Sequence, residues 1–376
     1  MHSCYLKTDA DVVAREFDQL SRPVYGLLGI PIDAVASSKA ISLIRIAAQH
    51  RRPFLISTPN VNFLILSQAD GDFRESLSMS DLCLVDGAPI VLLAKLLGIP
   101  ISGRVAGSDI FERLKNDTSG QSLNVFLFGG TDKAAAIVSD LLNRSGGLRC
   151  VGTLNPGFGT VEEMSNNRIF DAINGGNADF LAVFLSAEKE QKWLLRNHKL
   201  LATPVRCGLG GTINFHAGLV KRAPRGVRKL GLEWLWRIKE EPYLWRRYWN
   251  DGRKLSALCI INVIPLIIED LRRRRAPSRT LTVQQHDETA LILVKLSGDA
   301  VAANVQIAIA AFRDALISNK KIVVDLSDVL NIDHRFFGLL LMLRKVLREQ
   351  GLALDFCGAN NRIRRVFKLN GFVSLL

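Results

Sequence analysis

Short apolar runs alternate with longer amphipathic stretches along residues 54–208. Runs rich in Val, Ile, Leu and Phe are typical of buried strands, whereas apolar residues spaced three or four apart are typical of helices. We expect strands at 54–57, 82–85, 124–128, 180–185 and 205–208, and helices at 61–68, 89–97, 109–115, 134–143 and 190–197. Strands that alternate with helices predict an α/β domain with a mostly parallel sheet and helices on both faces.

The pattern changes after Gly218. Residues 221–276 are rich in Arg, Trp and Tyr, are expected to be mostly helical, and end in four arginines followed by Ala, Pro and Ser. The Arg-, Pro- and Ser-containing stretch at the end of this segment predicts a linker. Beyond it, strands at 280–283, 290–296, 321–326 and 352–356 and helices at 305–316 and 336–350 predict a small α/β domain. We therefore expect three parts, at 1–220, 221–276 and 280–376, in a chain too long for one hydrophobic core.

The positive charge of the chain is concentrated in one segment. The formal net charge is +13, and residues 221–279 contain 16 Lys and Arg against 6 Asp and Glu. A local basic block predicts an anionic partner, which from charge alone is phospholipid, nucleic acid or a polyphosphate.

Cysteine spacing and hydropathy bear on where the protein works. The six cysteines are isolated and form no Cys-x-x-Cys pair, so we expect free, mostly buried thiols in a reducing compartment. The first residues lack the basic start and apolar run of a signal peptide. The longest apolar stretch, at 257–268, contains Pro265 and is shorter than the roughly 20 residues that span a bilayer. We expect a cytoplasmic protein without a transmembrane helix.

Polar residues follow the predicted strands, where an α/β sheet usually binds its ligands. Thr58, Asn60 and Asn62 follow the strand at 54–57 and either line a pocket or simply cap a helix. Asp86 ends the next strand and is either a general base or part of an Asp-Gly turn. Arg104 is either a cation for a diphosphate or an ordinary surface arginine.

Paired glycines, Gly129 and Gly130, separate a strand from a helix and allow backbone N–H groups to approach a phosphate. Their spacing matches neither a dinucleotide fingerprint nor a Walker A loop. No zinc-binding spacing occurs, and the Asp-x-Asp at Asp9 and Asp11 precedes the first strand and is interpreted as a solvated helix face. We expect no metal and no cofactor.

Taken together and in this order, these sites resemble the WecG/TagA/CpsF family of glycosyltransferases. The resemblance covers about residues 24–247 and continues through the segments 177–181, 188–193, 208–215, 217–224 and 233–237. Many family members have Pro-Lys-Gln-Glu where residues 188–191 read Glu-Lys-Glu-Gln, so the proline is absent and the acid and the amide are exchanged.

The resemblance implies a Rossmann-like domain that transfers an N-acetylhexosamine, its uronic acid or a related hexose from a UDP-sugar to a polyprenyl-diphosphate-linked saccharide. The product is a surface-polysaccharide precursor, and the mechanism is inverting and metal-independent. Asp86 resembles the base that deprotonates the acceptor, with Thr58 and Asn60 in the same pocket, and Arg104 resembles the cation near the donor diphosphate. Further substrate-binding positions are Asn62, Gly129, Gly130, Glu190, Gln191, Gly210, Gly211 and Asn214.

A lipid-linked acceptor requires the enzyme to work at the membrane, and the basic segment is suited to bind there. We expect residues 221–276 to lie on the inner face of the cytoplasmic membrane, with aromatic side chains at headgroup depth. The alternative is a helical pair that closes the domain and buries its aromatics. The residues expected at the membrane or the acceptor are Arg222, Arg225, Trp234, Arg237, Arg246 and Arg247. The expected partners are UDP-sugar, lipid-linked saccharide and membrane, and not nucleic acid.

The C-terminal part resembles the STAS domain of anti-sigma factor antagonists, through residues 322–327, 332–333, 339–351, 358 and 364–367. His334 stands where that family has a phosphorylatable serine, so we expect a docking module for a protein partner. Two other functions stay open: a non-catalytic membrane-bound adaptor that recruits a partner through this domain, and a different nucleotide-dependent enzyme. The lack of a dinucleotide fingerprint is evidence against the latter.

Overall fold

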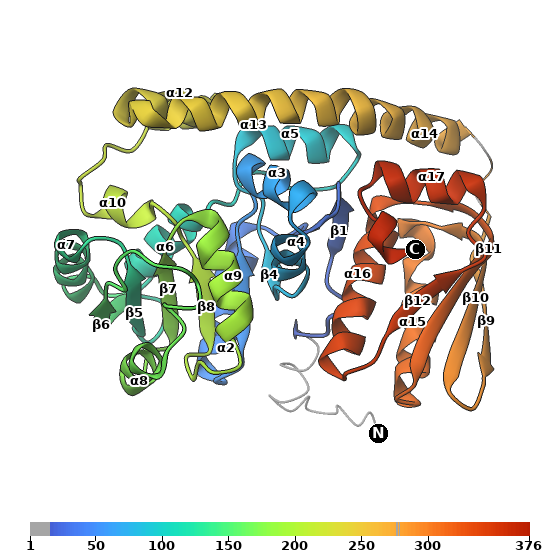
Figure 1. The fold of residues 1–376 in the computed structure, drawn as a ribbon, viewed down its shortest axis with the longest axis horizontal. Helices are drawn as coiled ribbons and strands as arrows, with labels where there is room; N and C mark the ends of the chain where they lie inside the picture. The colour runs from blue at the N-terminus through green and yellow to red at the C-terminus, as the bar shows by residue number, and fades with distance from the viewer. Residues whose placement is uncertain (1–15, 276, 278) are drawn as a thin grey trace, which may run out of the picture. The chain divides into compact units, whose positions relative to one another are not determined.

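The computed structural model describes residues 16–275, 277 and 279–376 (Figure 1). The chain divides into two compact units, one formed by Ala34–Ile264 and the other by the described residues up to Asp33 together with Pro265–Leu376. The predicted division into three parts follows sequence character rather than contacts, and its boundaries stay predictions.

The larger unit contains, within its described residues, a six-stranded sheet in the order β4-β3-β8-β7-β5-β6. Every pair of neighbouring strands is parallel, which confirms the predicted α/β fold. The strands are β3 (Phe54–Ser57), β4 (Leu82–Cys83), β5 (Leu123–Gly129), β6 (Leu148–Leu154), β7 (Phe180–Phe184) and β8 (Val205–Gly208). Sequence reasoning missed β6, because it is an edge strand in which only Leu148 is buried and the buried run of a central strand is absent.

Helices cover both faces of this sheet, as predicted. Phe128 of β5 stacks on Trp193 of α9 with ring centroids 4.6 Å apart, inside an apolar cluster that includes α8. The neighbouring residue Leu127 points the other way and is also fully buried. The helices are α2 (Ser37–Gln49), α3 (Val61–Ala69), α4 (Gly71–Ser78), α5 (Ala88–Leu96), α6 (Gly107–Asn116), α7 (Asp132–Asn143), α8 (Asn167–Gly175), α9 (Ala187–Asn197) and α10 (Thr212–His216).

The basic segment is helical, as predicted. It comprises α11 (Arg225–Lys229), α12 (Glu233–Glu240), a 3-10 turn η1 (Pro242–Leu244), α13 (Trp245–Leu258), a π-helical turn η2 (Cys259–Val263) and α14 (Ile264–Arg275). Among the described residues, none of the helices combines the length and the apolar character that crossing a membrane requires.

The smaller unit contains, in its described part, a four-stranded sheet in the order β12-β11-β10-β9, in which only β9 runs antiparallel to its neighbour. The strands are β9 (Thr282–Asp287), β10 (Leu291–Ala300), β11 (Lys321–Ile332) and β12 (Leu354–Cys357), and the helices are α15 (Val305–Ile317), α16 (His334–Glu349) and α17 (Asn361–Leu369). This arrangement confirms the predicted small α/β domain.

An N-terminal hairpin completes the smaller unit. Its strands β1 (Val24–Leu27) and β2 (Ile30–Asp33) pair antiparallel, and β1 packs on α16. A Cβ at Gly338 of α16 would lie 2.0 Å from the carbonyl oxygen of Val24, so only glycine permits this close approach. The hairpin was not predicted, and its packing on α16 could not be, because Val24 and Arg335 are 311 residues apart.

All described cysteines are free thiols. Cys83 and Cys207 are buried, whereas Cys150 and Cys259 are partly exposed and Cys357 is exposed. The prediction of mostly buried thiols is therefore wrong for the last three. Cys4 and the Asp-x-Asp at Asp9 and Asp11 lie outside the described residues.

Candidate active site

Thr58 lies where the loop after β3, the start of α6 and the loop after β8 come together. Its side chain is buried. A Cβ at Gly107, the first residue of α6, would lie 3.3 Å from Thr58 Oγ1 and 2.9 Å from Leu209 Cδ2. The glycine thus allows α6 to approach Thr58 and the β8 loop closely.

Asn60 and Asn62 lie at the start of α3 and have different partners. The Asn60 side chain accepts a hydrogen bond from the backbone N–H of Phe63 at 3.2 Å, which is a helix N-cap. Asn62 Nδ2 donates to Asp251 Oδ2 of α13 at 3.2 Å, and Asp251 is only 8% exposed. Sequence reasoning missed Asp251, since a pair 189 residues apart leaves no local pattern.

Asp86 follows β4 and is partly exposed. Its backbone N–H donates to the carbonyl of Pro59 at 2.9 Å, so the loops after β3 and β4 are joined at this point. Although the residue is partly exposed, the surrounding protein desolvates the Asp86 carboxyl and raises its pKa to about 6, with Glu233 and Asp109 adding to the rise and Arg104 opposing it. A carboxylate with a pKa near neutrality is suited to accept a proton from a hydroxyl.

Arg104 is the centre of a charged network. Its guanidinium donates to Glu233 of α12 and, at 3.1 Å, to Asp109 of α6. Asp109 also accepts from Arg222 at 2.5 Å and lies 3.5 Å from Arg228. Residues of the basic segment therefore reach the same network as Arg104. Of these, Arg222 was predicted near the acceptor, whereas Glu233 and Arg228 were missed.

The basic segment passes close to the start of α5, two residues after Asp86. Gly231, between α11 and α12, has φ +73°, and a Cβ there would lie 2.6 Å from the Cβ of Ala88. Gly87 itself has φ +90° and lets the chain turn directly into α5. The sequence signal for this contact is Gly231 itself, which comes two residues before the helix that begins at Glu233.

The paired glycines form a tight turn between β5 and α7. Gly129 has φ +96°, and a Cβ there would lie 2.7 Å from the carbonyl oxygen of Phe184 at the end of β7. Gly130 N–H donates to that oxygen at 3.1 Å, and a Cβ at Gly130 would meet Ile213 of α10 at 3.0 Å. The glycine loop thus lies beside the end of β7 and the start of α10.

Glu190 and Gln191 are buried side chains of α9 that contact the loops after β8 and β3. Glu190 is 3% exposed and its Oε2 accepts from Gly210 N–H at 2.9 Å. Burial raises the pKa of Glu190 to about 8. Gln191 Oε1 accepts from Ser57 Oγ at 2.8 Å, while its buried Nε2 has no hydrogen-bond partner among the described residues. Direct substrate contacts of both residues stay predictions.

The remaining predicted site residues lie at α10 and along the basic segment. Asn214 is partly exposed in α10, and a Cβ at Gly211 would lie 3.4 Å from a guanidinium nitrogen of Arg237. Arg237 donates to Glu241 at 2.8 Å and lies 5.2 Å from the centre of the Phe215 ring. Arg246 and Arg247 lie over the rings of Trp245 and Tyr248, and the side chain of Arg225 is outside the described part of the structure.

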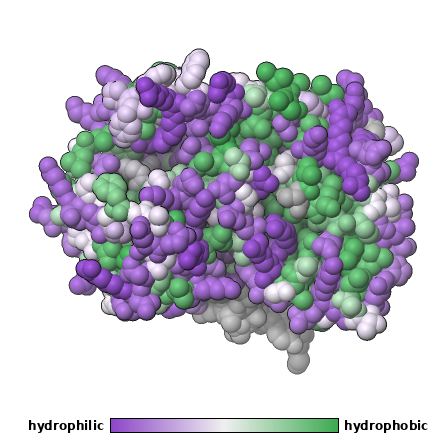
Figure 2. All heavy atoms as spheres, viewed as in Figure 1, coloured by the Kyte–Doolittle hydropathy of each residue, from purple (hydrophilic) through white to green (hydrophobic). Residues whose placement is uncertain are grey.

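The aromatic residues of the basic segment are not a buried core. Trp234, Trp245 and Trp249 are 41%, 52% and 69% exposed. The apolar side chains of Ile260 and Ile261 are also exposed, at 66% and 65%. On the face that Figure 2 shows, hydrophobic side chains lie among hydrophilic ones. The alternative in which these aromatics are core is therefore wrong for the three tryptophans.

No group of three or more His, Cys, Asp or Glu side chains that could hold a metal ion occurs in the described part of the chain. The polar groups near the sheet edge are instead the Asp86 carboxyl and the arginines around Arg104. In the glycine loops, Gly130 N–H donates to Phe184 and Gly210 N–H donates to Glu190.

Comparison with known proteins assigns both parts of the chain. Residues 281–376 match the family described as Mlab, STAS domain. A Bacillus subtilis protein named N-acetylglucosaminyldiphosphoundecaprenol N-acetyl-beta-D-mannosaminyltransferase is 28% identical over 194 residues, which are 51% of this chain and 74% of the relative. A Bacillus spizizenii protein of the same name is 27% identical over 212 residues, 56% of this chain and 80% of the relative. The model of the Glycosyl transferase WecG/TagA/CpsF family matches residues 25–265, more than half of the chain, and the chain therefore belongs to that family.

Proposed function

We propose that the protein transfers an N-acetylhexosamine, its uronic acid or a related hexose from a UDP-sugar to a polyprenyl-diphosphate-linked saccharide, as a step in surface-polysaccharide synthesis. The observation that supports this most directly is a carboxyl with a pKa raised to about 6, Asp86, beside the arginine network at the carboxyl edge of the sheet. The two Bacillus relatives carry names of transferases acting on a diphosphoundecaprenol saccharide.

In the proposed reaction, Asp86 accepts the proton of the acceptor hydroxyl as that oxygen attacks the anomeric carbon of the donor. The new C–O bond forms as the bond from the anomeric carbon to UDP breaks, which inverts the configuration. Arg104, with Arg222 and Arg228 nearby, offsets the charge that develops on the leaving diphosphate. In this proposal the arginines take the place of a metal ion, and the transfer uses no cofactor.

Carboxylates pair with the arginines that a diphosphate would need. Arg104 is bound to Glu233 and Asp109, and Asp109 also holds Arg222. An incoming diphosphate would therefore exchange with Glu233 at Arg104.

We further propose that the basic segment holds the enzyme on the inner face of the cytoplasmic membrane. The exposed Trp245, Trp249, Ile260 and Ile261 would lie at headgroup depth, and neighbouring cations such as Arg246 and Lys254 would meet anionic lipid. The lipid-linked acceptor would then remain in the bilayer while its saccharide enters the site.

The test is UDP release from a panel of UDP-sugars in the presence of a synthetic prenyl-diphosphate sugar, with EDTA present. Asp86→Asn is expected to lower the rate by at least about 100-fold, as loss of a general base does. Asp140→Asn, an exposed carboxylate of α7, serves as the matched control and should keep the wild-type rate. Near-wild-type activity of Asp86→Asn would refute the base assignment. Absence of turnover with every donor, together with intact vesicle binding, would favour the adaptor alternative.

A further inference from the structure

Two helices of the smaller unit, α14 and α17, carry an unusual excess of positive charge. Together they contain eight basic residues and two acidic ones, Glu269 and Asp270. The basic residues are Arg272, Arg273, Arg274 and Arg275 at the end of α14 and Arg362, Arg364, Arg365 and Lys368 on α17. Helix α17 contains no acidic residue.

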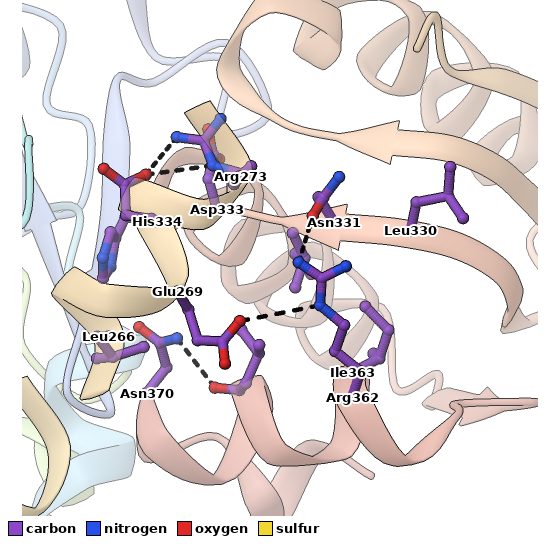
Figure 3. A pocket seen from close by; sticks show the side chains of 13 residues that line it. Leu266, Glu269, Arg273, Leu330, Asn331, Asp333, His334, Arg362, Ile363 and Asn370 are labelled. Atoms are coloured by element: carbon purple, nitrogen blue, oxygen red, sulfur yellow. Dashed lines mark hydrogen bonds and ion pairs between the residues drawn. The ribbon is translucent and has the colours of Figure 1, made fainter. Parts of the chain in front are cut away.

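The two acidic side chains form ion pairs with arginines of these same two helices. They line a pocket enclosed by α14, the end of β11 and α17, where Glu269 points toward Arg362 (Figure 3). Glu269 is 13% exposed and lies 3.9 Å from Arg362 and 3.6 Å from Arg365. Asp270 accepts hydrogen bonds from Arg273 and Arg274 of its own helix. The Glu269 ion pairs join the two helices, and eight basic residues on α14 and α17 face only these two acids of the same helices.

Most of these basic side chains are exposed, although Arg273 lines the pocket and is 27% exposed. Those of Arg272 and Arg274 are 64% and 59% exposed, and those of Arg362 and Arg365 are 52% and 58% exposed. Arg364 and Lys368, one helical turn apart on α17, are exposed as well. Side chains this exposed can reach an anionic surface without unfolding the unit.

Exposed apolar residues accompany these cations. Ile268 and Leu271 of α14 are 44% and 50% exposed, although α14 also has a buried face at Leu266. Apolar residues next to arginines favour a lipid surface over nucleic acid, because lipid offers both acyl chains and phosphates, whereas a nucleic-acid backbone offers mainly phosphate.

We propose that this basic surface, formed by α14 and α17 and called here the α14–α17 surface, binds the headgroups of anionic phospholipids. Helix α14 belongs to the segment 221–276 of the proposed function, on which this proposal rests, and α17 adds a direct contact between the STAS domain and the membrane. Each Lys or Arg near an anionic membrane contributes about 1 kcal/mol, or about five-fold in affinity. Removing two exposed cations of α17 should therefore be measurable.

The experiment compares two variants of the full chain in flotation with phosphatidylcholine vesicles that contain or lack phosphatidylglycerol. Arg364→Gln with Lys368→Gln removes two charges from α17, and is expected to weaken binding to the anionic vesicles by about ten-fold or more. Lys320→Gln with Lys321→Gln removes two charges at the start of β11, the end opposite the pocket, and should stay within about two-fold.

Equal effects of the two double variants, or no effect of either, would overturn the proposal. So would duplex DNA binding that exceeds vesicle binding and is lost in the α17 variant. UDP release with a water-soluble acceptor separates this proposal from the proposed function. The α17 variant should retain that activity, and Asp86→Asn should retain vesicle binding, so either idea can fail alone.

Discussion

Glu190 offers a pH-dependent test of how the site loop is supported. Its carboxyl is 3% exposed and accepts a hydrogen bond from Gly210 N–H, and burial raises its pKa from 4.5 to about 8. The unfolded chain therefore releases this proton at lower pH than the folded chain does. Above the unfolded pKa, the folded state loses stability as the pH rises, until the folded group itself ionises near pH 8.

The magnitude follows from the two pKa values. Each pH unit between them corresponds to about 1.4 kcal/mol, so the wild-type chain should lose about 3 kcal/mol between about pH 5 and 7.5 relative to Glu190→Gln, whose amide does not titrate. For a unit of this size, a loss of about 3 kcal/mol lowers the melting temperature by roughly 6–12 °C. The amide introduced by this substitution retains an oxygen that can accept from Gly210 N–H, so the loop contact itself is preserved.

Thermal unfolding of the two proteins at a series of pH values measures this difference. Glu162→Gln, which removes an exposed carboxylate of the same unit, is the control and should follow the wild-type curve. A melting-temperature difference between wild type and Glu190→Gln that stays constant from about pH 5 to 8.5 would show that Glu190 is not a buried neutral acid.

Three further predictions concern the glycine turn after β5, the proposed base and the contact between α3 and α13. Gly129→Ala should lower the melting temperature of the unit more than Gly157→Ala, since both have positive φ but only Gly129 lacks space for a Cβ; equal losses would contradict this. The rate of sugar transfer should rise with pH to a plateau above about 6, as Asp86 ionises, and a profile without that limb would exclude Asp86 as the titrating base. Asp251→Ala should destabilise α13 by about 1 kcal/mol through loss of the Asn62 bond, measured by hydrogen exchange, and unchanged protection of α13 would show that the bond contributes nothing.

Local sequence determined most of the secondary structure. Short apolar runs rich in Val and Phe, such as Phe180–Phe184, predict buried strands, and the Asn60, Thr131 and Asp333 side chains cap the helices that follow them. The position of Asp86 after a strand and that of the paired glycines before α7 could be predicted from local sequence for the same reason. A polar residue at the end of a buried parallel strand faces the edge where loops converge.

Tertiary structure alone decided which of these residues meet. Arg104 and Glu233 are 129 residues apart, and Asn62 and Asp251 are 189 apart, so no period or spacing relates them. The hairpin at Val24–Asp33 carries residues of the matched family, yet it packs on α16 of the C-terminal domain. A chain's short-range patterns fix helices, strands and caps because these depend on neighbours within a few residues. Ion pairs, raised pKa values and close backbone approaches depend on which segments fold against one another.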